Sequence, residues 1–309
     1  MSESLKKLLE KNRKRKMGDT SAIQPSQSPM PKEKTLNSDP NKADQCFVII
    51  TDVHSYERDV AAFDLCLESL PILDKLYNVT KVVQLGDLLE GGSTKTHPVS
   101  NVYDTVPDYT DELDWAINEF WKPVMRSCPN ANFYAMFGNH EDRINKWLAQ
   151  RVGANELSQA MFEDFSPKGL YEDMGIHVTP YGNEDVRSGI LEIFPKLVCV
   201  HGWSFAMHAA KVHLDKMMGA NSVIFGHTHR KQDYVRRNPV NNDQVGAFSL
   251  GALAKTNLLY QRGIPCDHTL GFGIVLTHKD SFLILPIDIK VTSTGHRKLI
   301  LPDGTVLTK

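Results

Sequence analysis

Hydrophobic residues in this chain gather in short runs rich in β-branched residues, and the first of these runs end in polar residues. The runs FVIITD at 47–52 and KVVQLGD at 81–87 are examples, and both predict buried strands that end in an acid. Helix-like stretches separate the early runs, whereas the chain from 245 onward is mainly strand-like. This order predicts two sheets packed together, with helices outside.

The same pattern places the remaining elements. We predict a strand that runs into a polar turn over 132–141, and further strands at 175–181, 189–194, 196–201 and 222–227. Helices are predicted at 57–78, 110–127, 141–151, 155–164 and 204–218. Pro71 is expected to mark a kink or a boundary in the first helix. In the last helix, apolar residues at 3-4-3 spacing predict one buried face. The residues of that face are Met207, Ala210, Leu214 and Met217.

The first 45 residues have a different composition from the rest. Residues 17–45 are rich in Ser, Pro, Asn and Lys and offer little to bury, so we expect 1–45 to be a disordered tail with a basic segment. That tail is either a solvated arm or a nucleic-acid contact. A single domain is expected over 46–309, with a loop excursion at 90–125 and a C-terminal β-hairpin at 295–309.

Composition narrows the class of protein. The 309 residues are 41% hydrophobic, which suits a globular core, and no run approaches the roughly 20 apolar residues of a membrane span. The N-terminus lacks the apolar core of a signal peptide, and the five cysteines form no CxxC pair. These features predict a cytoplasmic protein. The net charge is −2, and residues 1–16 carry +5, so residues 17–309 carry −7. An acidic body of this kind does not favour general binding of nucleic acid.

Polar clusters follow five of the predicted strands: TDVH, GD, GNHE, HG and GHTH. Because strand ends meet at one edge of a sheet, side chains far apart in sequence can converge there. Carboxylates, imidazoles and an amide suit Mn, Fe or Zn, and too many are present for one four-coordinate ion. They suit two ions that share a carboxylate. The candidate ligands are Asp52, His54, Asp87, Asn139, His201, His227 and His229.

The TDVH, GD and HG clusters are each more often structural when taken alone, whereas GNHE and GHTH are more specific, and all five in this order favour a metal site. The order D-x-H, GD, GNH-(D/E), H and GHxH over roughly 46–289 resembles the calcineurin-like metallophosphoesterases, of the bacterial and phage type. The resemblance implies a four-layer α/β/β/α sandwich of two mixed sheets. It also implies a dinuclear centre in which Asp87 bridges the ions. Asp52, His54 and His229 would complete one ion site, and Asn139, His201 and His227 the other.

The resemblance also implies a reaction, which is direct hydrolysis of a phosphoester by a metal-activated hydroxide. His140 would act beside the phosphate as general acid or transition-state stabiliser. Glu90, three residues after Asp87, would orient His140. Arg143 either reaches the phosphate or is a surface residue of a helix. The expected cofactors are two divalent ions, Mn first, with Fe, Zn, Ni or Co as alternatives.

The substrate is less constrained than the reaction. The stretch GDLLEGG lacks the Arg of the phosphoprotein phosphatases. Only about 20 residues follow Ile289, so we expect no cap of the kind that the repair nucleases carry. We expect a phosphodiester of nucleic acid or nucleotide, with a phosphomonoester of nucleotide or protein as the alternative and an inactive scaffold as the third. The basic stretch RKQDYVRR at 230–237 either touches such a polyanion or is a solvated loop. No membrane partner is expected.

Overall fold

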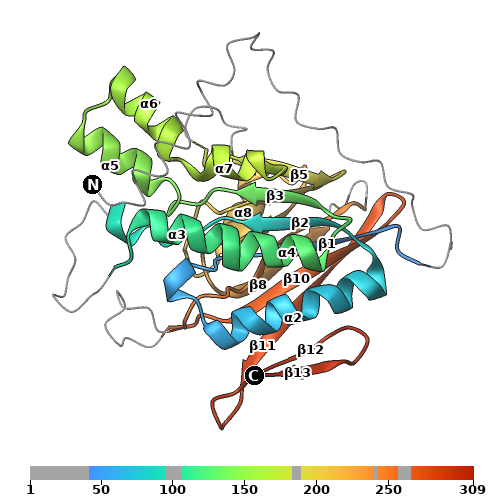
Figure 1. Cartoon of the computed structure of the whole chain (residues 1–309). Helices are drawn as coiled ribbons and strands as arrows, with labels where there is room; N and C mark the ends of the chain where they lie inside the picture. The colour runs from blue at the N-terminus through green and yellow to red at the C-terminus, as the bar shows by residue number, and fades with distance from the viewer. Residues whose placement is uncertain (1–41, 95–105, 183–188, 238, 240–241, 257–265) are drawn as a thin grey trace.

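The computed structural model describes residues 42–94, 106–182, 189–237, 239, 242–256 and 266–309. Within them, two mixed β-sheets pack face to face, and helices cover the outer face of each sheet (Figure 1). These four layers confirm the α/β/β/α sandwich. Most of the predicted tail, up to residue 41, lies outside the described residues, as do 95–105 of the predicted excursion.

The larger sheet has eight strands. They are β1 (Gln45–Ile50), β2 (Val79–Leu85), β3 (Asn132–Met136), β4 (Ile176–Thr179), β10 (Leu270–His278), β11 (Ser281–Val291), β12 (Arg297–Ile300) and β13 (Val306–Thr308). Their order is β13-β12-β11-β10-β1-β2-β3-β4. Strands β1 to β4 run parallel, whereas β10 to β13 are antiparallel to their neighbours, so the sheet is mixed.

The smaller sheet has five strands. They are β5 (Ile190–Phe194), β6 (Leu197–Val200), β7 (Ser222–Phe225), β8 (Lys231–Arg237) and β9 (Gln244–Leu250). Their order is β5-β6-β7-β9-β8. The three central strands are parallel, and β5 and β8 pair antiparallel at the edges.

Helices form the two outer layers. They are α2 (Val60–Tyr77), α3 (Tyr109–Trp115), the π-helical turn η3 (Ala116–Trp121), α4 (Lys122–Ser127), α5 (Arg143–Arg151), α6 (Glu156–Phe165), α7 (Pro167–Asp173) and α8 (Ala209–Lys216). In Figure 1, α2, α3 and α4 lie across the larger sheet, and α8 packs on β7, β8 and β9 of the smaller one. Local capping defines α2: the Asp59 carboxylate accepts the Ala62 N–H at 3.0 Å, and Asn78 ends the helix in a left-handed conformation.

The alternation of side chains along β1 explains how one strand serves two cores. Cys46, Val48 and Ile50 face α2 and its neighbours, whereas Phe47 and Ile49 face the smaller sheet. All five side chains are fully buried. A strand that is covered on both faces has a continuous apolar sequence, as residues 46–50 do.

The parallel strands bring the polar clusters to one edge of the sandwich. Strands β1, β2 and β3 run in the same direction, so the segments after them leave the larger sheet together. Strands β6 and β7 do the same in the smaller sheet. The five clusters found in the sequence follow these five strands, and the site is therefore built between the two sheets where their strands end.

The structure corrects one predicted helix. The helix expected over 204–218 begins only at Ala209, and Met207, which was expected on its buried face, is 75% exposed. Residues 205–207 instead form a loop, because the side chains of Arg230 and Gln232 bind its backbone carbonyls. The boundary considered at Pro71 is also wrong, since α2 continues through it.

The basic stretch after the GHTH motif is mainly a strand rather than a loop, and two of its charges are paired with acids. Residues 231–237 are the edge strand β8. Lys231 pairs with Asp288 at 2.8 Å and Arg236 pairs with Asp215 at 3.1 Å, so acidic neighbours compensate these charges. Charged side chains on an edge strand also discourage pairing with another chain.

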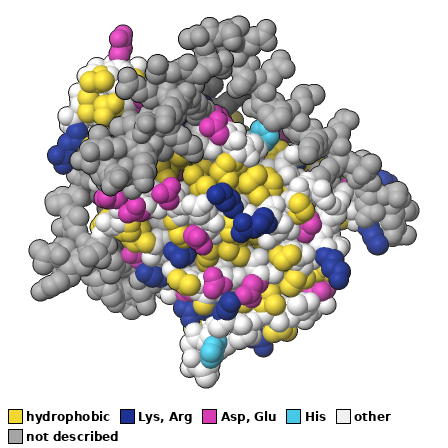
Figure 2. Space-filling model, viewed as in Figure 1, with side chains coloured by type: hydrophobic (Ala, Val, Ile, Leu, Met, Phe, Trp, Pro, Cys, Tyr) yellow, Lys and Arg dark blue, Asp and Glu magenta, His cyan; other side chains and the backbone are white. Residues whose placement is uncertain are grey.

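Among the residues that the structure describes, the face covered by α2, α3 and α4 carries both signs of charge. In the view of Figure 2, Lys and Arg side chains alternate with Asp and Glu among scattered hydrophobic ones. In the part of the chain that the structure describes, no helix is long and apolar enough to cross a membrane.

The C-terminal hairpin β12–β13 contacts the start of α2 through an ion pair between Arg297 and Asp59, and the contribution of this contact to stability can be tested. Arg297 binds the Asp59 carboxylate through Nε and Nη2 at 3.0 and 2.5 Å, while Asp59 also caps α2. We expect Asp59→Ala to lower the free energy of unfolding by about 2 kcal/mol, because it removes a cap and a partly buried bidentate pair.

The control is Asp64→Ala, also on α2, whose carboxylate is 43% exposed and 4.0 Å from Lys309. We expect a change below about 0.5 kcal/mol there. Urea unfolding followed by circular dichroism measures both variants. Equal losses in the two would show that the contact between Arg297 and Asp59 adds nothing.

Candidate metal centre

The seven candidate ligands gather where the strands end. One group consists of Asp52, His54 and His229, and a second of Asp87, His201 and His227. Within each group, one ligand atom per residue lies within 4.8 Å of the others. All six are buried except His227, which is half-buried. Asn139 joins the second group, with its Oδ1 atom 3.0 Å from His201 Nε2.

Asp87 lies between the two groups. Its Oδ2 atom is 3.2 Å from His201 Nε2 in one group and 3.8 Å from His54 Nε2 in the other. The His54 and His229 Nε2 atoms face each other at 2.9 Å, and His229 Nε2 is 3.5 Å from Asp52 Oδ1. The carboxylate of Asp87 thus lies within 3.8 Å of an imidazole from each group.

The donor atoms fit divalent cations. Oxygen and imidazole nitrogen are the donors that Mn, Fe and Zn accept. Among the described residues, the buried carboxylates of Asp52 and Asp87 contact imidazoles and backbone N–H groups rather than Lys or Arg. In addition, the buried Nδ1 of His229 has no hydrogen-bond partner among these residues, which is unusual for a purely structural histidine.

The electrostatics of the site keep its carboxylates ionised. Burial alone would raise the pKa of Asp87, but the imidazoles of His140 and His201 hold it well below its ordinary value. Burial opposes a charge on His201 as well, yet Asp87 raises the pKa of that imidazole to about 10. The site therefore carries concentrated negative charge that protons or metal ions compensate.

Backbone strain is concentrated at the same residues. Five of the seven candidate ligands have a left-handed backbone, with φ between 45° and 68°. Such a conformation is unfavourable for a residue with a Cβ atom and persists only where the surroundings enforce it. The strained residues are Asp52, His54, Asp87, His227 and His229. Their clustering supports a functional site more strongly than burial does.

Two motif glycines are needed because neighbouring ligands approach the backbone closely. A Cβ atom on Gly86 would lie 2.3 Å from His201 Nδ1, and one on Gly138 would lie 2.1 Å from Asp87 Oδ1. Gly86 also has a φ of 92°. The glycines of the GD and GNHE clusters thus make room for ligands that come from other clusters.

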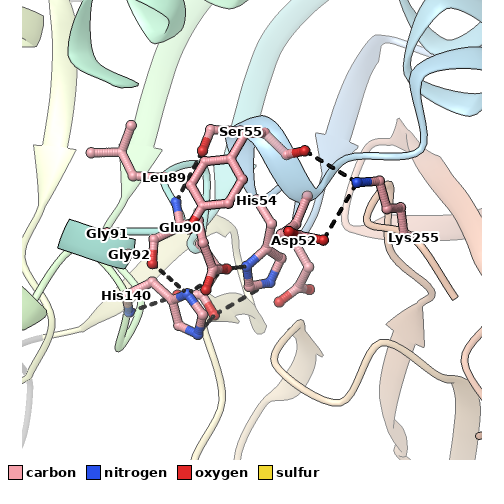
Figure 3. A network of polar contacts seen from close by, with 12 residues as sticks. Asp52, His54, Ser55, Leu89, Glu90, Gly91, Gly92, His140 and Lys255 are labelled. Carbon is pink, nitrogen blue, oxygen red and sulfur yellow. Dashed lines mark hydrogen bonds and ion pairs between the residues drawn. The ribbon is translucent and has the colours of Figure 1, made fainter. Parts of the chain in front are cut away.

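Beside the two groups lies a third cluster around Glu90 (Figure 3). Glu90 Oε2 is 2.8 Å from His54 Nδ1 and 3.1 Å from His140 Nδ1, so the expected contact between Glu90 and His140 is present. Burial alone would raise the pKa of the Glu90 carboxyl, but His140 and then His54 hold it well below its ordinary value. The same carboxylate therefore touches one candidate ligand and the histidine beside the site.

Arg143 belongs to this cluster rather than to the open surface. Its Nη1 donates to Glu90 Oε1 at 3.0 Å, and its Nη2 is 2.7 Å from His140 Nε2. Its side chain is 21% exposed. Arg143 lies at the start of α5, as expected, but it points toward the site.

Two buried glutamates that sequence reasoning missed hold the loops of the site. Glu141 accepts the N–H groups of Asp87, Leu89 and Gly138 at 2.7 to 2.9 Å. Glu112, on α3, accepts the Ser55 hydroxyl and the N–H groups of residues 90–92 at 2.7 to 3.3 Å. The acid in the GNHE cluster was a signal for Glu141, whereas nothing in the sequence marked Glu112.

The close approach at Gly86 gives a test of the site's assembly. We expect Gly86→Ala to displace His201 and to leave at most one Mn²⁺ per chain after dialysis, measured by inductively coupled plasma mass spectrometry. Gly304→Ala is the matched control, because its φ of 89° gives the same backbone strain while nothing lies within 4 Å of its Cβ position. If both variants keep the metal content of the wild type, the crowding at His201 is irrelevant to metal binding.

Solved structures with related chain paths include proteins of several kinds. Vps29 from Chaetomium thermophilum is 9% identical with a TM-score of 0.37, over 86% of this chain and 95% of that one. A dimetal phosphatase from Danio rerio is 11% identical with a TM-score of 0.37, over 78% and 95%. The Pseudomonas putida nuclease MPE is 15% identical with a TM-score of 0.32, over 77% and 87%. No curated protein sequence matches this chain.

The comparison with protein families gives a clear result. The model of the family described as calcineurin-like phosphoesterase matches residues 47–231. That range is more than half of the chain and includes the strands after which all seven candidate ligands follow. The chain therefore belongs to the calcineurin-like phosphoesterase family.

Proposed function

We propose that this protein is a phosphoesterase that binds two divalent metal ions, Mn²⁺ in the first place, and that its substrate is a phosphodiester of nucleic acid or nucleotide. The observation that carries the proposal is the position of Asp87 Oδ2 between the two ligand groups. Asp52, His54, Asp87 and His229 would hold one ion, and Asp87, Asn139, His201 and His227 the other. The five free cysteines support a reducing, cytoplasmic setting.

The bound ions would supply Lewis-acid charge that activates water and neutralises phosphoryl oxygens. The protein's own contribution centres on His140, whose Nε2 lies 3.8 Å from Asp87 Oδ2. Its Nδ1 faces the Glu90 carboxylate, and this contact fixes the ring and favours its protonated form. Burial opposes that charge, but Asp87 and Glu90 raise the pKa of His140. Arg143 Nη2 donates to His140 Nε2 at 2.7 Å, so His140 would give a proton to the leaving oxygen only when Nε2 is protonated and released from Arg143, and would otherwise stabilise the transition state.

Glu90 and Arg143 act through other residues in this proposal. Glu90 contacts both His54 and His140, so it couples a metal ligand to the proton donor. Arg143 binds Glu90 and His140 and holds the pair in place. Both are positioning residues.

The reaction is tested on metal-stripped protein with Mn²⁺ added back, using bis(p-nitrophenyl) phosphate and p-nitrophenyl phosphate in parallel. We expect faster hydrolysis of the diester, and a kcat about 100-fold lower in His140→Ala, because a general acid contributes that much or more. Faster hydrolysis of the monoester would favour a phosphatase. Absence of turnover with two ions bound would favour a binding scaffold.

The role of Glu90 has its own test. We expect Glu90→Gln to lower kcat about 10-fold to 100-fold or to weaken Mn²⁺ binding by a similar factor, because it removes the charge that orients two histidines. Glu119→Gln is the control, since Glu119 is exposed on η3. Steady-state kinetics and metal titration measure both. An unchanged rate and pH profile in Glu90→Gln would contradict the role.

A further inference from the structure

The loop after β6 displays large apolar side chains beside the metal centre. Phe205 is 79% exposed and Met207 is 75% exposed, and Trp203 is partly exposed as well. The ring of Phe205 lies 6.2 Å from the ring of His227, measured between centroids. A single exposed phenylalanine elsewhere on the surface would need no explanation, but one next to a candidate metal ligand indicates a contact with a bound ligand.

The loop is held in place although its side chains face solvent. Arg230 Nη2 donates to the carbonyls of Phe205 and Ala206 at 2.9 and 2.7 Å, and Gln232 Nε2 donates to that of Met207 at 2.8 Å. Arg230 also pairs with Asp267 at 3.1 Å. These bonds fix the backbone that carries Phe205, so a ligand that meets its ring does not first have to order the loop.

Aromatic side chains lie on the side of one ligand group, and polar side chains lie on the side of the other. Tyr181 lies 6.1 Å from His201, and Phe205 lies beside His227, so aromatic rings flank the group formed by Asp87, His201 and His227. The polar side is the cluster of Glu90, His140 and Arg143 described above. A substrate held between the two sides would present its leaving oxygen to His140 and its other ester arm to Phe205.

We propose that Phe205 is the platform on which the base of a nucleotide stacks, in the ester arm that stays on the phosphorus. This inference rests on the proposed phosphodiesterase function. A phenyl ring offers a flat apolar face, and stacking of a base on an aromatic side chain is worth about 1–3 kcal/mol. In a phosphotyrosine the aromatic ring belongs to the leaving group and would lie beside His140 instead, so the position of Phe205 favours a nucleotide.

The test compares two esters with the same leaving group. Thymidine 5′-(p-nitrophenyl) phosphate carries a base, and methyl p-nitrophenyl phosphate does not. We expect Phe205→Ala to lower the ratio of kcat/KM for the thymidine ester over the methyl ester about tenfold, chiefly through KM. Phe205→Trp should restore the ratio. Met207→Ala, an equally exposed apolar residue of the same loop, is the control and should leave the ratio as it is.

A binding measurement separates this proposal from the proposed reaction. Calorimetry of the Mn²⁺-loaded protein should show about tenfold tighter binding of thymidine 5′-monophosphate than of 2-deoxyribose 5-phosphate, and Phe205→Ala should remove that preference. If both esters are hydrolysed but thymidine 5′-monophosphate is not preferred, the platform is refuted and the phosphodiesterase function stands. If the preference is found and lost in Phe205→Ala while no ester is hydrolysed, the platform stands and the reaction is refuted.

Phosphotyrosine is the remaining alternative and has a distinct outcome. Loss of phosphotyrosine binding in Phe205→Ala, with thymidine 5′-monophosphate binding as in the wild type, would overturn the nucleotide assignment.

Discussion

The carboxylate of Asp87 is the group around which the rest of the site is arranged. Its Oδ2 atom lies between His201 and His54, and its Oδ1 atom accepts the His140 N–H at 3.0 Å. Its backbone is equally engaged, since its N–H donates to Glu141 and its carbonyl accepts the His54 N–H. A single residue therefore joins the segments after β1, β2, β3 and β6. A buried charge with these contacts is stable only if cationic groups surround it, which is the condition that a metal site meets.

Several unfavourable features of the surrounding structure are needed to keep this buried carboxylate in its position. The left-handed backbones of the ligands and the glycines that pack against them are unfavourable choices for an ordinary fold. Buried glutamates compensate by binding the backbone N–H groups of the loops, as Glu112 does for residues 90–92. Stability and function compete at this edge of the sandwich, whereas the buried apolar residues of β1 and β2 behind it, as the structure describes them, have no left-handed backbone.

The sequence predicted those parts of the structure that depend on local patterns. The strands are short apolar runs and the ligands follow them directly, so the positions of Asp52, Asp87 and His201 at strand ends could be read from the sequence. The start of α8 could not, because Arg230 and Gln232, distant in sequence, hold residues 205–207 in a loop. Nor could the role of Glu112, since only the fold brings α3 against the loop at 90–92. The ion pairs of β8 could not be predicted for the same reason. Their acidic partners, Asp288 and Asp215, belong to elements that are distant in sequence.

The topology of the larger sheet has a consequence for the order of folding during synthesis. β1 is the first strand among the described residues, yet one of its two neighbours is β10, and the register joins Gln45 to Thr277. All seven candidate ligands precede residue 230, so the ribosome has made every one of them before it makes β10. Until then the strand that leads to Asp52 has an open edge, and contacts this distant in sequence form slowly. The nascent chain thus carries all seven candidate ligands for some time without the complete sheet that positions them, and any metal binding is expected only after β10 has been made.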